Sequence, residues 1–306
     1  MGLFDHLPDS AEIYEVGPRD GLQNEAVAVG TVRKIRLIEA LVDAGLKRIE
    51  ITSFVAPHWI PQLADGEDVA RLAGRRAGVI FSALCPNEKG LQRAQQVGME
   101  EIAVFMSASE THNRRNINKT IDETLGVFAG FVPSARELGL RVRGYLSTLW
   151  GCPYEGEVDM ARGRALARSL LDLGCYEISL GDTLGVGTPL QTKQILECFL
   201  EEVPADSLAL HLHDTRGQAL ANILVGLEMG IRTFDSAIAG LGGCPYAPGA
   251  SGNVATEDLV YMLHGLGMQT GVDLERLWDA GRVAEAIVYR ELPGRVHRAG
   301  LQSLRQ

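Results

Sequence analysis

Two histidines two positions apart, His211 and His213, are the strongest sign of chemistry in the sequence. They close an apolar run that begins at Ser207, and Asp214 follows them directly. In a β-strand successive side chains alternate between faces, so both imidazoles would lie on one face at the end of a strand. In a helix they would lie roughly 200° apart. We therefore expect a strand whose last residues hold one metal ion, or else two histidines that are only hydrogen-bonded.

Short apolar or β-branched runs alternate along the chain with amphipathic stretches. The predicted strands are Glu12–Val16, Arg48–Ser53, Val79–Leu84, Glu101–Met106, Arg141–Leu146, Glu177–Leu180, Leu208–His213 and Thr233–Ala239. Three helical stretches, Thr31–Ala44, Asp159–Leu173 and Gln218–Met229, are each followed by a glycine and then by a strand. This alternation predicts an α/β fold, a single (β/α)8 TIM barrel. The alternative is an open doubly wound sheet, but the turn Gly17–Gly21 lacks the glycine pattern of a dinucleotide site.

No low-complexity linker or break in composition divides the 306 residues. We expect one catalytic domain over residues 1–306, with the barrel from about 11 to 272 and a helical C-terminal extension from about 273 to 306. The extension is expected to cap the barrel or to support a contact in a homo-oligomer, expected to be a dimer.

Composition excludes several classes of protein. A formal net charge of −10 argues against a nucleic-acid-binding surface, and no apolar run approaches the roughly 18 residues of a membrane span. Five widely spread cysteines do not form a disulfide framework and fit a reducing compartment. The first residues show no basic region followed by an apolar core, so we expect no targeting peptide and a cytoplasmic location.

Barrel geometry would gather polar residues at one mouth, because active sites of this fold lie at the C-terminal ends of the strands and in the loops that follow. The polar side chains expected there are Arg19, Asp20, Glu50, Ser53, Asn87, Asp182, His211, His213 and Asn253. Buried charges are costly unless they are paired or bound to metal. One carboxylate (Asp20), two imidazoles and one carboxamide (Asn253) need no thiolate, which favours Mg²⁺ or Mn²⁺ over a structural zinc ion.

Two long segments carry a family resemblance. Glu15–Glu25, which reads Glu-Val-Gly-Pro-Arg-Asp-Gly-Leu-Gln-Asn-Glu, resembles the opening motif of 3-hydroxy-3-methylglutaryl-CoA (HMG-CoA) lyases, and Gly242–Asp258 resembles that family's cysteine loop. Shorter matches are Glu50–Val55, Leu180–Gly185 and His211–Asp214. The resemblance extends from about Ala11 to Val272. Related barrels of the same metal-dependent superfamily share the Arg-Asp pair and His-x-His, but not the Gly-Cys-Pro-Tyr loop.

The resemblance implies a role for each matching residue. The implied ligands of the divalent cation are Asp20, His211, His213 and Asn253. Arg19 would face the thioester or the developing enolate oxygen, and Cys244 would be an acid in its loop. Asp20 or a ligand histidine such as His211 would be the catalytic base. Glu50 and Asp182 would orient the substrate or the groups around it.

The implied reaction is the cleavage of HMG-CoA to acetyl-CoA and acetoacetate, a retro-Claisen step of leucine and branched-chain catabolism. The tertiary hydroxyl loses its proton, the C–C bond breaks, and the thioester enolate is protonated. A divalent cation would polarise the hydroxyl, and Arg19 would stabilise the enolate oxygen. Three alternatives stay open: a lyase for a related 3-hydroxy-3-substituted glutaryl-CoA, an acetyl-CoA-dependent synthase or 2-oxo-acid aldolase on the same barrel, and a non-catalytic acyl-CoA-binding barrel.

The cysteine assignment has a competitor. Gly151–Tyr154 repeats the tetrapeptide Gly-Cys-Pro-Tyr, so Cys152 is a second candidate for the acid. We favour Cys244 because flanking glycines make a hinge there. Pro248 stands where the family often has a polar or basic residue, and it would stiffen the loop.

Three predicted substrate contacts also have structural alternatives. Arg114 and Arg115 stand where the family often has lysines, and they would reach the CoA phosphates or lie on a solvated surface. Asp182 would contact the substrate or only pair and cap within the barrel.

Overall fold

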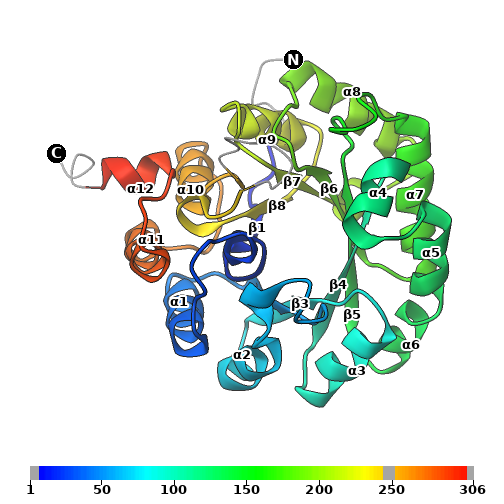
Figure 1. Cartoon of the computed structure of the whole chain (residues 1–306). Coiled ribbons are helices and arrows are strands. Elements are labelled where there is room, and N and C mark those ends of the chain that lie inside the picture. Colours follow the sequence, from blue (N-terminus) through cyan, green and yellow to red (C-terminus); the bar gives the residue numbers. More distant parts are fainter. Residues whose placement is uncertain (1–6, 244–251, 302–306) are drawn as a thin grey trace.

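The structure is a computed structural model that describes residues 7–243 and 252–301. Eight parallel strands close into a barrel in sequence order, with β8 paired to β1 (Figure 1). The strands are β1 (Glu12–Glu15), β2 (Arg48–Ser53), β3 (Ile80–Leu84), β4 (Glu101–Ser107), β5 (Arg141–Ser147), β6 (Glu177–Asp182), β7 (Leu208–Leu212) and β8 (Thr233–Ser236). The predicted TIM barrel is confirmed, and each predicted strand is present with its ends shifted by no more than a few residues.

Helices surround the barrel on its outside (Figure 1). They are α1 (Thr31–Asp43), α2 (Gly66–Ala73), α3 (Glu88–Gln96), α4 (Glu110–Ile117), α5 (Ile121–Ala129), α6 (Val132–Glu137), α7 (Met160–Leu173), α8 (Pro189–Leu200), α9 (Ala219–Glu228), α10 (Thr256–Gly265), α11 (Leu274–Val288) and α12 (Arg295–Ala299). Short helical turns are η1 (Gly17–Gly21), η2 (Pro61–Leu63), η3 (Ala205–Ser207) and η4 (Ile238–Gly240). None of the helices in the described ranges has the length and apolarity of a membrane span.

The predicted C-terminal extension is helical and packs on the barrel's outer layer. Helix α11 lies against α1, and α12 lies against α10 (Figure 1). The Trp278 indole N–H of α11 donates to the His297 carbonyl at 2.9 Å, which ties α12 to α11. The extension therefore packs against α1 and α10, the helices that follow β1 and β8.

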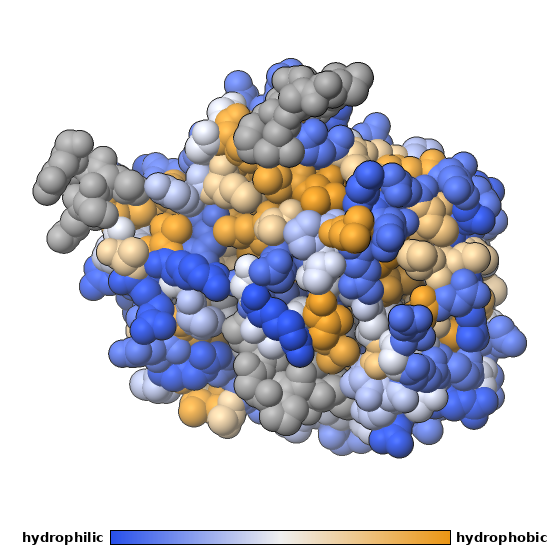
Figure 2. Space-filling model, turned by 90° about the horizontal axis from the view of Figure 1, so that it is seen from above, coloured by the Kyte–Doolittle hydropathy of each residue, from blue (hydrophilic) through white to orange (hydrophobic). Residues whose placement is uncertain are grey.

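The outer surface mixes hydrophilic and hydrophobic residues. On the side shown in Figure 2, hydrophobic residues gather in the centre and hydrophilic residues surround them. Large exposed apolar side chains of the described residues include Val32, Trp59, Leu72, Leu138 and Leu190. The homo-oligomer stays a prediction.

Alternation along the strands separates an apolar layer from a polar one. On β5, Val142 and Leu146 join the hydrophobic core between sheet and helices, whereas Arg143 and Tyr145 point into the barrel, where they contact side chains of distant strands. Buried polar side chains inside the barrel include Tyr14, Glu50, Ser82, Glu101, Arg143, Tyr145, Glu177, Ser179, His211 and Asp235. Most barrels of this class fill this space with branched apolar residues. This interior instead supports a polar network that ends at the C-terminal mouth.

Candidate metal centre and active site

Asp20, His211 and His213 come together at the C-terminal mouth of the barrel. Each offers a ligand atom, and these atoms lie within 4.8 Å of one another. Asp20 lies in η1 directly after β1, His211 lies in β7, and His213 follows the last residue of that strand. The period-2 prediction for the two histidines is confirmed, because both rings reach the same group of ligand atoms.

Asn253 reaches this group through the segment that follows the loop after β8. An antiparallel bridge joins His213 to Asn253, and the Asp214 N–H donates to the Gly252 carbonyl at 2.9 Å. The Asn253 side-chain N–H donates to Asp20 Oδ2 at 2.8 Å. Gly252 has φ 82°, and a Cβ there would lie 2.7 Å from the backbone of Gly242. Only glycine permits this close approach, which places Asn253 beside the other three predicted ligands.

The Arg-Asp pair is presented by a tight turn. Glu15 Oε1 accepts hydrogen bonds from the backbone N–H groups of Gly17 at 2.7 Å and of Ile238 at 2.9 Å. A Cβ on Gly17 would lie 2.5 Å from the same oxygen. The Asp20 N–H donates to the Val16 carbonyl at 2.7 Å. The motif therefore requires glycine at position 17, because a side chain there would collide with Glu15. The buried Glu15 in turn fixes η1 against the start of the loop after β8.

Arg19 is buried and held on two sides. Its Nε donates to Glu50 Oε2 at 2.5 Å, and its Nη1 donates to Asp20 Oδ1 at 2.7 Å. The Tyr145 hydroxyl also donates to Glu50 Oε2, at 3.1 Å, and the Tyr145 ring lies 5.4 Å from the guanidinium. Burial alone would lower the pKa of Arg19, but Glu50 and Asp20 raise it well above its usual range. Arg19 is therefore a fixed positive charge whose orientation is set by its neighbours.

Two of the predicted ligands have shifted pKa values, and the shifts favour the protonation states in which such groups bind metal ions. Burial would raise the pKa of Asp20, but Arg19 and then the histidines lower it to about 2. Burial, and after it the neighbouring His211, lowers the pKa of His213 to about 3. Asp20 is therefore a carboxylate and His213 a neutral imidazole at neutral pH, which are the forms that bind metal ions.

Unpaired acceptors and the charge of the barrel interior both fit a divalent cation. Asn253 Oδ1, His213 Nδ1 and Glu50 Oε1 are buried without a hydrogen-bond partner among the described residues. The charged groups in the barrel interior are the buried cations Arg19, Arg48 and Arg143, the buried anions Glu50, Glu101, Glu177 and Asp235, and the half-buried Asp20 at the C-terminal mouth. With all five carboxylates ionised, the three guanidinium groups leave a net charge of −2. Because buried charge is costly unless it is compensated, this oxygen-and-nitrogen site suits one divalent cation.

Three buried residues around the site were missed in the sequence. Asp235 of β8 lies 3.2 Å from His211 Nδ1, Arg143 of β5 binds Asp235, and Tyr145 contacts Glu50. A signal for them existed, because Arg143 and Asp235 are charged residues in the middle of runs that otherwise predict buried strands. Such charges inside a strand indicate partners across the barrel.

Comparison with known proteins agrees with this geometry. A family model described as HMGL-like matches residues 10–284. The chain belongs to the HMGL-like family. It is 54% identical over 275 residues to the cytoplasmic 3-hydroxy-3-methylglutaryl-CoA lyase of Mus musculus, a match that covers 90% of this chain and 80% of the relative.

Solved structures of the family superpose closely on the chain. A hydroxymethylglutaryl-CoA lyase from Pseudomonas aeruginosa is 49% identical, with a TM-score of 0.94 over 96% of this chain and 98% of that one. An HMG-CoA lyase from Acinetobacter baumannii, in complex with coenzyme A and 3-methylmalate, is 40% identical, with a TM-score of 0.91 over 95% of both chains. The family resemblance inferred from the two long motifs is therefore confirmed.

Asp182 lies at the same mouth but uses its carboxylate on its own loop. Oδ1 accepts from the Val186 N–H at 3.2 Å and Oδ2 from the Gly187 N–H at 2.7 Å. Burial raises the pKa of Asp182 above its usual range. The structure thus shows the capping role that was the alternative for Asp182, and its substrate contact stays a prediction.

The two arginines predicted to reach CoA phosphates lie on the exposed face of α4, which begins three residues beyond β4. Arg114 pairs with Glu110 at 3.1 Å within the helix. The Arg115 guanidinium lies 4.3 Å from the centre of the Tyr154 ring. Both side chains follow the C-terminal end of β4, and their phosphate contacts stay predictions.

The two copies of Gly-Cys-Pro-Tyr differ in what the structure describes. Cys244 lies outside the described residues. Cys152 is buried, its sulfur lies 2.9 Å from Ser109 Oγ, and it accepts N–H groups from Tyr154 and Glu155 at 3.4 Å. These contacts give Cys152 a structural role in the loop after β5.

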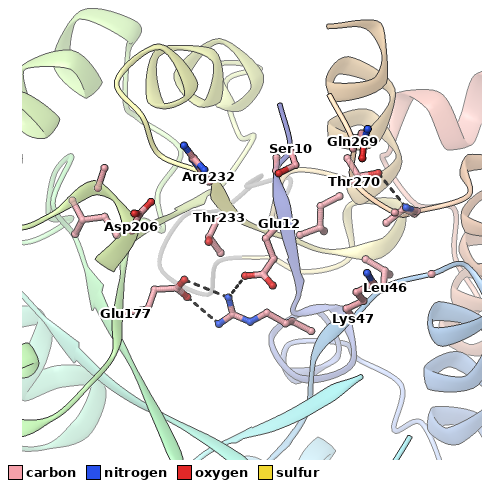
Figure 3. A pocket seen from close by; sticks show the side chains of 18 of the residues that line it. Ser10, Glu12, Leu46, Lys47, Glu177, Asp206, Arg232, Thr233, Gln269 and Thr270 are labelled. Carbon is pink, nitrogen blue, oxygen red and sulfur yellow. Dashed lines mark hydrogen bonds and ion pairs between the residues drawn. The ribbon is translucent and has the colours of Figure 1, made fainter. Parts of the chain in front are cut away.

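A cavity of about 600 Å³ opens at the opposite, N-terminal mouth (Figure 3). On its floor Arg48 pairs with Glu12 at 2.5 Å and with Glu177 at 3.0 Å. Charged residues around it include Lys47, Arg141, Asp206 and Arg232. This cavity contains none of the residues predicted for the active site.

Proposed function

We propose that the chain is a divalent-metal-dependent carbon–carbon lyase that cleaves HMG-CoA to acetyl-CoA and acetoacetate. The observation that carries the proposal is the convergence of Asp20, His211, His213 and Asn253 beside the fixed Arg19. The lyases at about half sequence identity support the substrate, and the relative bound to coenzyme A and 3-methylmalate supports an acyl-CoA partner. The proposal includes Mg²⁺ or Mn²⁺ as the cation, a homodimer as the assembly and the cytoplasm as the location.

The four converging residues would hold the cation through one carboxylate oxygen, two imidazole nitrogens and one amide oxygen. When bound, a divalent cation supplies Lewis acidity toward the hydroxyl and carboxylate oxygens of the substrate. The unpaired Asn253 Oδ1 supports this assignment, because a buried amide oxygen without a partner is costly unless a ligand occupies it.

Arg19 is suited to stabilise the charge that develops during cleavage. When the bond between C2 and C3 breaks, its electron pair moves to C2 and onto the thioester oxygen as an enolate. Glu50 and Asp20 fix Nε and Nη1, so Nη2 has no hydrogen-bond partner among the described residues and can donate to that oxygen. A donor that is oriented before reaction costs no reorganisation in the transition state.

Two proton transfers complete the reaction. Asp20 or a ligand histidine takes the hydroxyl proton, so that C3 becomes the ketone of acetoacetate. Cys244 delivers a proton to C2, which yields acetyl-CoA. The thiol must start protonated for this role, so a strongly lowered pKa would be unfavourable.

The test is acetyl-CoA release from HMG-CoA and from a panel of 3-hydroxyacyl-CoAs, with and without Mg²⁺. We expect metal-dependent release of acetyl-CoA and acetoacetate, with HMG-CoA the preferred substrate. Preference for a longer 3-substituent would move the assignment to a related lyase. Consumption of acetyl-CoA with a 2-oxo acid, without cleavage of HMG-CoA, would contradict the proposal and favour a synthase.

A further inference from the structure

Asp235 lies between a predicted metal ligand and a buried arginine. Its Oδ2 lies 3.2 Å from His211 Nδ1 and accepts the Ser179 hydroxyl at 2.8 Å. Arg143 donates to both carboxylate oxygens, from Nη2 to Oδ1 at 2.7 Å and from Nη1 to Oδ2 at 3.1 Å. All four residues are buried and come from four consecutive strands, β5 to β8.

This arrangement dictates the tautomer of His211. A carboxylate only accepts hydrogen bonds, so His211 Nδ1 must carry the proton that faces Asp235. In the neutral ring Nε2 then has the free lone pair, which is the form needed to ligate a cation. The neighbouring His213 differs, because its Nδ1 has no hydrogen-bond partner among the described residues.

Arg143 is itself immobilised, so it can hold Asp235 in one orientation. Its Nε donates to Glu177 Oε1 at 2.6 Å. Its guanidinium lies 4.0 Å from the centre of the Tyr14 ring and 5.0 Å from that of Tyr145. With no exposed surface, the arginine has no water to exchange for these partners, and its two Nη groups match the two carboxylate oxygens.

We propose that Asp235, oriented by Arg143 and Ser179, is a positioning residue that fixes the tautomer and ring orientation of His211 and thereby sets the affinity of the site for its divalent cation. Asp235 acts through His211 and does not touch the substrate. A hydrogen-bonded carboxylate behind a ligating histidine typically changes metal affinity by about 10- to 100-fold. The inference rests on the proposed metal-dependent function.

The decisive variant is Asp235→Asn, which keeps the size of the side chain. Its amide can present an N–H to His211, and this favours the tautomer with the proton on Nε2. We expect Mn²⁺ to bind about 10- to 100-fold more weakly, measured by electron paramagnetic resonance of free Mn²⁺ without substrate. The ¹⁵N chemical shifts of the His211 ring should move away from those of the Nδ1–H tautomer.

Glu177→Gln is the matched control. It weakens the Nε side of the same arginine, but Glu177 does not contact His211. We expect it to lower the unfolding temperature as Asp235→Asn does, while Mn²⁺ affinity stays within about twofold. Ser179→Ala removes one hydrogen bond from Oδ2 and should weaken Mn²⁺ binding by a smaller factor.

The outcomes separate the inference from the function on which it rests. Equal loss of Mn²⁺ affinity in Asp235→Asn and Glu177→Gln would show a structural role only, and unchanged affinity in Asp235→Asn would overturn positioning. If Asp235→Asn does not fold, Ser179→Ala decides, because unchanged affinity and unchanged ring shifts there would overturn the inference. Failure of the unaltered protein to bind Mn²⁺ would instead contradict the metal-dependent function.

Discussion

The two mouths of the barrel are both lined by buried charged residues, but they differ in which atoms are left without partners. At the N-terminal mouth Arg48 binds Glu177, Glu12 and the Tyr176 hydroxyl, and the unpaired buried atom there is its own Nε, a donor. At the C-terminal mouth the unpaired buried atoms include His213 Nδ1 and Asn253 Oδ1. A cation binds to atoms with a free lone pair, so among the described residues only the C-terminal mouth offers unpaired atoms suited to bind one.

This difference shows that buried acceptor atoms without hydrogen-bond partners locate the site better than the position of the cavity does. The cavity of about 600 Å³ lies at the N-terminal mouth (Figure 3), where the floor is already neutralised by ion pairs. Few buried polar groups in proteins lack a hydrogen bond, so each exception needs an explanation. At the C-terminal mouth, one bound cation would explain the exceptions together.

Removal of a metal ligand should have the largest effect. Asp20→Ala and His213→Ala each delete a ligand, so we expect kcat/KM to fall on the order of 10⁴-fold and Mn²⁺ affinity to fall with it. A chelator should abolish turnover in the unaltered protein, and Mg²⁺ or Mn²⁺ should restore it. Full activity of a demonstrably metal-free preparation would show that the unpaired acceptors at the C-terminal mouth do not mark a cation site needed for turnover.

The next largest effect is the difference in kcat expected between variants of the two cysteines in the repeated Gly-Cys-Pro-Tyr tetrapeptide. If Cys244 is the acid, Cys244→Ala should lower kcat by about 10³-fold without loss of Mn²⁺ binding, as for a deleted general acid. Cys152→Ala should leave kcat nearly unchanged and lower the free energy of unfolding by about 1 kcal/mol, because it deletes a small buried group. Initial rates, Mn²⁺ titration and urea unfolding of both variants check this.

The opposite result would move the catalytic acid. A loss of kcat in Cys152→Ala, with normal turnover in Cys244→Ala, would place the acid in the loop after β5. Thiol reagents give an independent check, because substrate should protect Cys244 from modification.

Substitution of Arg19 should change kcat more than KM. Its target charge exists only in the transition state, so Arg19→Gln should lower kcat by about 10²- to 10³-fold with a small change in KM. Arg19→Lys should not restore kcat, since an ammonium group cannot bind Glu50 and Asp20 and donate to substrate in the same geometry. Steady-state kinetics with HMG-CoA decide between this role and a ground-state clamp, which would raise KM at normal kcat.

The sequence was sufficient for the parts of the molecule that depend on local pattern. Period-2 alternation placed His211 and His213 on one face, and glycines after helices marked the turns that make a barrel of βα units. The group of ligands then followed from the rule that strand ends share one mouth. Because these are consequences of backbone geometry, they need no knowledge of distant partners.

The parts that were missed depend on contacts across the barrel. Asp235 and Arg143 are 92 positions apart and meet only when the strands close. Likewise Asp182 could be assigned to substrate or to its loop, and the backbone N–H groups of Val186 and Gly187 show the loop contact. A single sequence carries the charge of such residues but not the identity of their partners.

A smaller effect concerns the buried carboxyl of Glu257 in α10, which packs behind η4 and lies 3.6 Å from His297 Nδ1. Burial raises the pKa of Glu257 to about 8, while its Oε2 accepts the Ala239 N–H at 2.7 Å. The folded state binds this proton more tightly than the unfolded state, so the stability it provides is present below pH about 4.5 and is lost as the pH rises towards 8. Between pH 5 and 9 the free energy of unfolding of the unaltered protein should therefore fall by about 4 kcal/mol more than that of Glu257→Gln.

Urea unfolding at several pH values, in constant chelator, measures this slope. Glu88→Gln, on the exposed side of α3, is the control and should keep the slope of the unaltered protein. A slope that is unchanged in Glu257→Gln would show that the buried carboxyl does not titrate in this range.

The smallest expected effect is a change in the KM for HMG-CoA, and it tests which mouth of the barrel binds the CoA portion of the substrate. Arg114 and Arg115 lie beyond the C-terminal end of β4, whereas Lys47 and Arg232 line the cavity at the other mouth. Exposed ion pairs contribute up to about 1 kcal/mol each, so the Arg114→Ala/Arg115→Ala double variant should raise the KM for HMG-CoA by about 3- to 10-fold, more at low salt. The Lys47→Ala/Arg232→Ala double variant removes the same charge and should leave KM and kcat within about twofold of the unaltered protein. If instead the second pair raises KM and the first does not, CoA binds at the N-terminal mouth, and unpaired acceptors would locate the cation without locating the substrate.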